Sequence, residues 1–271
     1  MVNIRLGGVP EHFNMPLHYA LEQNLFLENN INLDWVDFPG GTGAMANALK
    51  ANEIDMALML TEGAIADIEN GAQNTILGFY VMSPLIWGIH VAANSSISLE
   101  NEVFGNRYAI SRKGSGSHLM AMVHAFQNGQ KIDEKQLVIV HNLEGAIKSL
   151  IQNESDIFFW EKFMTAKYVQ NDVLRRIGEF PTPWPCFVLV VKNDFFAQES
   201  DAISNLIAAI ENVLQNFKKV PNINKAIAQK YKLELYLVDE WIQSVQWASK
   251  INADKVEIGN VKRMLTNFGI I

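Results

Sequence analysis

The chain has 271 residues, of which 49% are hydrophobic and 19% charged, and this composition is typical of a globular protein with a large buried core. Its formal net charge of −7 excludes a general nucleic-acid-binding surface, because such a surface needs an excess of Lys and Arg. Cys186 is the single cysteine, so an intrachain disulfide and a Cys/His zinc site are also excluded.

The start of the sequence bears on its location. Val2 enters a strand-like pattern directly, without the basic and apolar regions of a signal peptide, and no apolar run is long enough to span a bilayer. We therefore expect a cytoplasmic protein as the sequence is written. A periplasmic or lipid-anchored protein is expected instead if a leader segment has been removed.

The first 81 residues alternate strand and helix patterns. The run Met56–Leu60 is apolar throughout, as expected for a strand buried on both faces of a parallel sheet. Pro16 suits the first turn of a helix, where no backbone N–H is needed. The predicted strands are Val2–Leu6, Ile31–Phe38, Met56–Leu60 and Thr75–Val81, and helices are predicted to start near Pro16, after Gly43 and at Thr61.

The rest of the chain repeats this alternation and then becomes helical. Strands are predicted at Tyr108–Ile110, Leu137–Val140, Ile157–Trp160 and Phe187–Val191, with helices after His118 and Gly145. The final helices are predicted at Ala202–Phe217, Lys225–Lys230, Asp239–Lys250 and Val256–Phe268. The proline-containing stretches Met82–Trp87 and Pro181–Cys186 are predicted to be extended crossovers, because proline resists helix formation.

A short pattern occurs twice. Asn-Glu-x-Asp, an apolar strand and then a glutamate appear once as Asn52–Glu62 and again as Asn153–Glu161. Coincidence between two polar turns is the alternative, but the order of strands and helices matches on both sides. We therefore predict an α/β protein with two similar lobes, each with a mixed and mostly parallel sheet. Residues 1–84 and 189–271 form the first predicted lobe, and residues 85–188 form the second, joined by a two-segment hinge.

Strand–helix alternation predicts that ligands bind at the carboxyl ends of the strands. If the two lobes face each other, the loops at these ends line one cleft. We predict no catalytic and no metal-binding residue. The predicted ligand-binding residues are His12, Phe13, Asn14, Gly40, Gly41, Thr42, Thr61, Glu62, Trp87, Gly114, Ser115, Gly116, Ser117, His118, Asn142, Trp160, Glu161 and Trp184.

The turn Arg112–His118 has two interpretations. Its glycines allow close approach of the backbone to a ligand, and its serines can cap the next helix while leaving amide N–H groups facing outward. Locally, a purely structural helix cap explains the same residues equally well. Arg112 and Lys113 would complement an anionic ligand, or they form an ordinary solvated pair.

The aromatic and acidic candidates also have structural alternatives. Trp160 is a candidate core residue, but Glu161 beside it needs a partner if it is buried, so the pair favours the cleft. Glu62 would accept a ligand or act as a solvated acid of a first helical turn. Trp87 and Trp184 either pack at the hinge or stack on a planar heterocycle. His12 and His118 are expected to be exposed to the cleft.

The sequence resembles the type II periplasmic-binding-protein fold, in the branch that binds nitrate, sulfonates and precursors of the thiamine pyrimidine. The resemblance covers nearly the whole chain, and the absence of an export signal is similar to a smaller fungal and bacterial group within it. The matching features are the helix Pro16–Leu27, the Gly-Gly-Thr turn at Gly40, Glu-Ile-Asp-Met-Ala at Glu53, Gly-Ser-Gly-Ser at Gly114 and the helical tail with Trp241.

The resemblance implies binding of a small polar or anionic metabolite, such as an aminopyrimidine or a sulfonate, with hinge closure and no cofactor. When proteins of this kind are exported, the expected partner is the permease of an ABC transporter. The alternative is an enzyme on the same fold, of thiamine-pyrimidine or menaquinone-pathway type, that uses His12 or His118 with Glu62 or Glu161. The cysteine-rich motif of the thiamine-pyrimidine synthase is absent. No oligomeric state is predicted.

Overall fold

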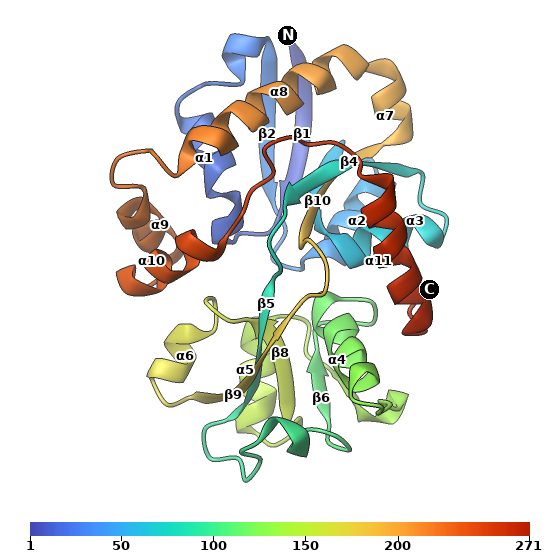
Figure 1. The fold of residues 1–271 in the computed structure, drawn as a ribbon, viewed down its shortest axis with the longest axis vertical. Helices are drawn as coiled ribbons and strands as arrows, with labels where there is room; N and C mark the ends of the chain where they lie inside the picture. The colour runs from blue at the N-terminus through green and yellow to red at the C-terminus, as the bar shows by residue number, and fades with distance from the viewer. The chain divides into compact units, whose positions relative to one another are not determined.

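The computed structural model describes all 271 residues, which fall into two compact units. Unit 1 comprises residues 1–83, 184–263 and 271, and unit 2 comprises residues 84–183 and 264–270. The chain therefore leaves or enters unit 1 at 83/84, at 183/184, within its last helix at 263/264 and at 270/271. Each unit is built on one five-stranded sheet with helices around it (Figure 1).

The sheet of unit 1 has the strand order β2-β1-β3-β10-β4. Its strands are β1 (Val2–Gly8), β2 (Ile31–Asp37), β3 (Met56–Leu60), β4 (Asn74–Val81) and β10 (Phe187–Lys192). Strand β10 pairs antiparallel with both β3 and β4, whereas β1 pairs parallel with β2 and β3. Every strand except β10 therefore points in the same direction.

Helices surround this sheet, and α8 is the longest of them (Figure 1). It buries one face that includes Ile203, Leu206, Ile210 and Phe217. The helices that begin in unit 1 are η1 (His12–Asn14), α1 (Met15–Glu22), η2 (Leu27–Asn29), α2 (Thr42–Lys50), α3 (Thr61–Glu69), α7 (Asn193–Gln198), α8 (Ser200–Phe217), α9 (Ile223–Tyr231), α10 (Leu235–Ser244) and α11 (Lys255–Asn267).

The sheet of unit 2 has the corresponding order β7-β6-β8-β5-β9, and here β5 is the strand that runs against the others. Its strands are β5 (Ile86–Ala92), β6 (Tyr108–Ile110), β7 (Leu137–Ile139), β8 (Ile157–Glu161) and β9 (Leu174–Pro181). Its helices are η3 (Glu100–Glu102), α4 (Gly116–Gln127), η4 (Glu134–Gln136), α5 (Leu143–Ile151) and α6 (Ala166–Gln170).

Alternation along β8 divides the core of unit 2 between two helices. Phe158 packs with Ala146 and Leu150 of α5. Its neighbour Phe159 lies on the other face, where its ring centroid is 5.3 Å from that of His124 in α4. Helices α4 and α5 therefore cover opposite faces of the sheet, and this explains the continuous apolar sequence of β8.

The same ion pair occurs in both units. In unit 1, the backbone N–H and the Nε of Arg5 donate to Asp55 Oδ2 at 2.9 and 3.0 Å, and Arg5 Nη2 donates to Asp55 Oδ1 at 2.6 Å. In unit 2, Arg107 makes the same three hydrogen bonds to Asp156, at 2.9, 2.9 and 2.8 Å. Arg5 lies in β1 and Asp55 in the turn before β3, whereas Arg107 directly precedes β6 and Asp156 lies in the turn before β8. The repeated sequence pattern therefore reflects a repeated structure.

The predicted fold class is confirmed, and most predicted strands lie within two residues of their expected bounds. The predicted crossovers Met82–Trp87 and Pro181–Cys186 contain the passages between the units at 83/84 and 183/184. The prediction missed strands β5 and β9, which begin or end within these two stretches. It was also wrong for the helix Asp239–Lys250. Helix α10 ends at Ser244, and the following residues bond to the end of β4 instead. Helix α1 likewise ends at Glu22, before the expected Leu27. No helix has the length and apolar character needed to cross a membrane.

We predict that the two ion pairs contribute unequally to stability, because the Asp55 side chain is 9% exposed and that of Asp156 is 25% exposed. Asp55→Asn should lower the free energy of unfolding by about 2–3 kcal/mol, since it weakens charge-assisted bonds in a buried setting. Asp156→Asn should lower it by about 1 kcal/mol or less. Urea unfolding followed by circular dichroism measures both, and equal losses would contradict the prediction.

Candidate functional site

The predicted residues of unit 1 meet at one edge of its sheet. Loops 12–14, 40–42 and 61–62 follow the carboxyl ends of β1, β2 and β3. Trp184 precedes β10, whose first residue Phe187 pairs with Leu60 and Val81 at the ends of β3 and β4. Because β10 is antiparallel to its neighbours, its start lies at the edge where they end. The topology therefore brings Trp184 to the edge that carries Glu62.

Glu62 is the most unusual residue at this edge. Its side chain is fully buried at the start of α3, and its Oε2 accepts a hydrogen bond from the indole N–H of Trp184 at 2.8 Å. Its Oε1 is buried without a hydrogen-bond partner. Burial raises the pKa of Glu62 to about 7, although its own backbone N–H and Trp184 act in the opposite direction. Oε1 therefore calls for a proton or for a donor from another molecule.

The loops around Glu62 are fixed by hydrogen bonds across the edge. Thr61 donates its hydroxyl to Pro185 O at 2.5 Å, and Thr42 Oγ1 accepts from Leu60 N–H at 3.1 Å. Gly41 has φ +68°, a conformation that favours glycine, and it opens helix α2. A Cβ at Gly63 would lie 2.5 Å from Thr42 Cγ2. The site therefore rests on close packing between the starts of α2 and α3.

The loop His12–Asn14 is held by aromatic rings. His12 is fully buried, and its ring centroid lies 4.7 Å from that of Phe13 and 4.2 Å from that of Trp241. The expectation that His12 is exposed was therefore wrong, because sequence reasoning missed the rings that α9 and α10 supply. Burial lowers the pKa of His12 to about 3, so its imidazole is neutral near pH 7. Asn14 is also buried and donates to Val9 O at 2.7 Å.

Unit 2 gathers its predicted residues at the equivalent edge. Loops 114–118 and 141–142 follow the carboxyl ends of β6 and β7, and Glu161 ends β8. Trp87 lies near the start of the antiparallel strand β5, where it pairs with Glu161. The two units thus place their candidate residues in the same topological position.

The serine turn caps helix α4 in detail. Ser115 Oγ accepts from the backbone N–H of His118 and of Arg112, both at 3.4 Å, and Ser117 Oγ accepts from Ser111 N–H at 3.0 Å. Gly114 has φ +75° and donates its N–H to His118 Nδ1 at 3.0 Å. The structural interpretation of the serine hydroxyls is therefore confirmed. Lys113 forms an exposed ion pair with Glu134.

Trp160 and Glu161 do not act as a pair. Side chains alternate along β8, so Trp160 shares a face with Phe158, and their ring centroids are 5.2 Å apart. Glu161 lies on the other face, and its Oε2 accepts from the backbone N–H of Phe163 and Met164 at 2.9 and 2.8 Å. Buried Glu161 therefore has partners, as the sequence argument required, and the turn after β8 provides them.

Trp87 is the clearest ligand candidate in unit 2. It is 4% exposed, and its indole N–H is buried without a hydrogen-bond partner. Asn142, by contrast, is exposed and caps α5 by accepting from Gly145 N–H at 2.8 Å. No group of three or more His, Cys, Asp or Glu side chains is arranged to hold a metal ion.

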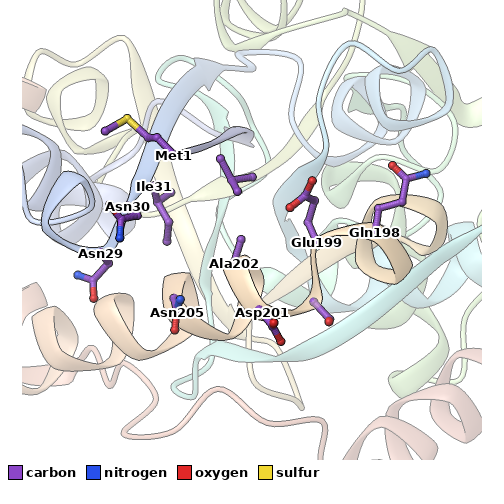
Figure 2. Close-up of a pocket in the computed structure, with 11 residues that line it drawn as sticks. Met1, Asn29, Asn30, Ile31, Gln198, Glu199, Asp201, Ala202 and Asn205 are labelled. Atoms are coloured by element: carbon purple, nitrogen blue, oxygen red, sulfur yellow. The ribbon is translucent and has the colours of Figure 1, made fainter.

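Two pockets lie away from the predicted residues. One, of about 310 Å³, is at the amino ends of β1 and β2 beside the start of α8, the edge opposite to Glu62 (Figure 2). The other, also about 310 Å³, lies between α5 and α6 and includes Ile147, Ile151 and Tyr168. Neither contains a predicted site residue.

The fold and its paired edges define a protein of the type II periplasmic-binding-protein class. The model of a family described as Ca3427-like periplasmic binding proteins matches residues 87–180. The structure of the Candida albicans CA3427 gene product is 30% identical, with a TM-score of 0.94 over 100% of this chain and 91% of that one. The chain belongs to this Ca3427-like family, and the resemblance predicted from sequence is confirmed.

More distant structures share the fold. The alkanesulfonate-binding protein SsuA from Xanthomonas axonopodis pv. citri, bound to MOPS, is 14% identical with a TM-score of 0.82, and the match covers 100% of this chain and 94% of that one. PhnD1 from Prochlorococcus marinus, in complex with methylphosphonate, is 12% identical with a TM-score of 0.66 over 99% of both chains. No curated protein sequence matches the chain.

We predict that Glu62 makes stability depend on pH. Its pKa of about 7 in the folded protein exceeds the ordinary value of 4.5, so between about pH 4.5 and 7 the unfolded chain loses a proton that the folded protein keeps. The free energy of unfolding should therefore fall as the pH rises through this range. Glu62→Gln should match the wild type at pH 4.5 and exceed it by roughly 2–3 kcal/mol at pH 8.

Urea unfolding between pH 4.5 and 8 measures this difference, and exposed Glu53→Gln is the matched control. Some pH dependence should remain in Glu62→Gln, because burial also raises the pKa of Glu11 to about 7. Parallel curves for the wild type and Glu62→Gln would show that the buried carboxyl does not carry this penalty.

Proposed function

We propose that the protein binds one small polar or anionic metabolite in a cleft between its two lobes and closes on it by a hinge motion. The ligand class is an aminopyrimidine, a sulfonate or a related molecule that carries both hydrogen-bond donors and acceptors. The protein thus acts as a solute-binding protein and not through a catalytic residue. The residues proposed to contact the ligand remain those predicted from the sequence, with Glu62, Trp184 and Trp87 as the principal ones.

The observation that carries this proposal is the buried oxygen Oε1 of Glu62, which accepts no hydrogen bond. A buried carboxyl oxygen without a partner is costly, and natural proteins rarely retain one without a purpose. Trp184 fixes the carboxyl by binding Oε2, so Oε1 is held in a defined direction. A ligand N–H would complete the hydrogen bonding of this group. An amino group on a planar heterocycle has the required donor beside a ring that Trp184 can contact.

Trp87, in unit 2, supports the same proposal. Its buried indole N–H can only donate, so it requires an acceptor such as a ring nitrogen, a carbonyl or a sulfonate oxygen. The backbone amides of the turn 114–117 are proposed as further donors to such acceptors. One unit therefore supplies an acceptor and the other supplies donors, and a ligand with both kinds of group suits the pair.

The structural neighbours favour an acidic group on the ligand. SsuA is described as binding alkanesulfonates and PhnD1 is seen with methylphosphonate, and both share this fold at low sequence identity. From these neighbours we propose only that the ligand carries a small oxyanion group. If the protein is exported, we propose that it delivers its ligand to the permease of an ABC transporter.

We predict that the bound ligand can be recovered with the protein and that Glu62 accepts a hydrogen bond from an N–H of the ligand. Native mass spectrometry of the protein purified from its own organism should show a bound small molecule. Isothermal titration calorimetry with methanesulfonate, methylphosphonate and 4-amino-2-methylpyrimidine then shows which of the three ligand classes the protein binds. Glu62→Gln should weaken the aminopyrimidine by about 10-fold or more, because a charge-assisted hydrogen bond contributes about 1.5–3 kcal/mol.

Glu53→Gln is the control for this measurement, since the residue is exposed and lies before the same strand. Trp184→Phe keeps an aromatic ring but releases Oε2, so it should weaken binding less than Glu62→Gln does. An unchanged affinity in Glu62→Gln for every ligand that binds the wild type would remove Glu62 from the site.

Hinge closure gives a separate prediction. Two of the points at which the chain crosses between the units, 83/84 and 183/184, include Pro84 and Pro183, which limit these crossings to extended backbone. Small-angle X-ray scattering should show a smaller radius of gyration when a ligand that raises the melting temperature is added. A ligand that stabilises the protein without compaction would contradict closure and leave binding intact.

A further inference from the structure

A segment near the end of the chain connects two parts of unit 1 that are distant in sequence. Residues Val245–Ala248, here called the tail segment, follow α10 and run beside the end of β4. Met82 N–H donates to Gln246 O at 2.7 Å, and Ala248 N–H donates to Tyr80 O at 2.9 Å. Val81 and Trp247 form an antiparallel bridge. The tail segment therefore extends the pairing of β4 up to the point where the chain leaves the unit.

The tail segment also binds the last residue before that point. Gln246 N–H donates to Ser83 Oγ at 3.1 Å, and Ser83 O accepts from Cys186 N–H at 3.3 Å. Ser83 precedes the first crossing, and Cys186 follows the second. The crossings at 83/84 and 183/184 are thus anchored in unit 1 through Ser83, and Gln246 holds Ser83 in place.

Trp247 reaches from the same segment to the loop after β1. Its indole N–H donates to Phe13 O at 3.0 Å, across 234 residues of sequence. Tyr80, which itself bonds to the tail segment, donates its hydroxyl to the same oxygen at 3.1 Å. The Trp247 ring is confined by Phe217 and Trp241, with centroids at 5.3 and 5.6 Å. The carbonyl of Phe13 is therefore held by two donors, and both are tied to the tail segment.

We propose that Trp247 is a positioning residue for the loop His12–Asn14 and that the tail segment couples this loop to the chain crossings at Ser83 and Cys186. The proposal rests on the proposed function in one respect, since it gives the loop a role in ligand contact. The coupling itself requires only unit 1. A ligand that displaces the loop would thereby move the anchors of the hinge.

Packing alone does not account for this arrangement. A phenylalanine would fill most of the space between Phe217 and Trp241, whereas an indole adds a donor aimed at a backbone oxygen. Gln246 is exposed, and its backbone forms the hydrogen bonds to Met82 and Ser83. These bonds therefore fix the course of the backbone and do not depend on a buried side chain. The hydrogen bonds thus form one continuous route from Phe13 through Trp247 and Gln246 to Ser83.

Hydrogen exchange on the ligand-free full chain tests the coupling. Ser83→Ala removes the hydroxyl that accepts from Gln246, and Trp247→Phe keeps a ring but removes the donor to Phe13 O. Each variant should raise exchange about 2- to 10-fold both in peptides covering 11–15 and in peptides covering 81–84, the effect of one hydrogen bond. The double variant should exchange no faster than the faster single variant, because both break one route.

Ser204→Ala is the matched control, since it removes an exposed hydroxyl from α8 in the same unit and should leave both peptides unchanged. Ser83→Ala that raises exchange only near 81–84 and 245–248 would overturn the coupling, and additive effects in the double variant would do so too.

Ligand affinity is the second measurement that tests the proposal. For the probe that binds best among methanesulfonate, methylphosphonate and 4-amino-2-methylpyrimidine, Trp247→Phe should weaken binding by about 5-fold, and exposed Ser204→Ala should not. An unchanged affinity alongside faster exchange in peptide 11–15 would overturn the positioning role. If no probe binds the wild type, the proposed function is in question, and the exchange experiment still decides the coupling.

Discussion

An ion pair that ties an arginine in or directly before the first parallel strand to the turn before the third is a constraint common to both units. Arg5 with Asp55 and Arg107 with Asp156 use the same three donors and span 50 and 49 residues. Each pair fixes the register at the amino end of β3 or β8, so the opposite ends of these strands arrive at a defined edge. Loops can then vary at that edge without disturbing the sheet, which is the arrangement a binding site needs.

The sheets of the two units have corresponding strand orders, but the residues at the carboxyl edges of their strands differ. Counting from Asn52 and Asn153, Glu161 corresponds in position to Leu60 and not to Glu62, so the glutamates that look alike in sequence occupy different sites. Glu161 closes its own turn, whereas Glu62 turns inward and meets Trp184. The result is an asymmetric pair of edges, with an acidic oxygen open in one unit and an indole N–H open in the other.

Local pattern was enough to predict the lobes, the apolar strands and the edge at which candidates gather, because these follow from periodicity and strand direction. It was not enough for β5 and β9, where prolines at the strand ends dominated the interpretation. Nor could it reveal the bond between Glu62 and Trp184, which joins residues 122 positions apart. The burial of His12 was missed for the same reason: its neighbour Trp241 comes from a helix more than two hundred residues later. A residue's exposure depends on such distant partners, and one sequence does not specify them.

The dependence of the first loop on the last part of the chain has an energetic meaning. A loop of three residues that had to become ordered on binding would cost about 1–2 kcal/mol per residue in backbone entropy. Trp247 and Tyr80 hold the carbonyl of Phe13 before any ligand arrives, so this cost is met during folding. The same bonds run on to Ser83, next to the point where the chain leaves unit 1. One hydrogen-bonded path therefore supports the loop and reaches the point where the chain leaves unit 1, so the segment that follows α10 is part of the support of the first loop.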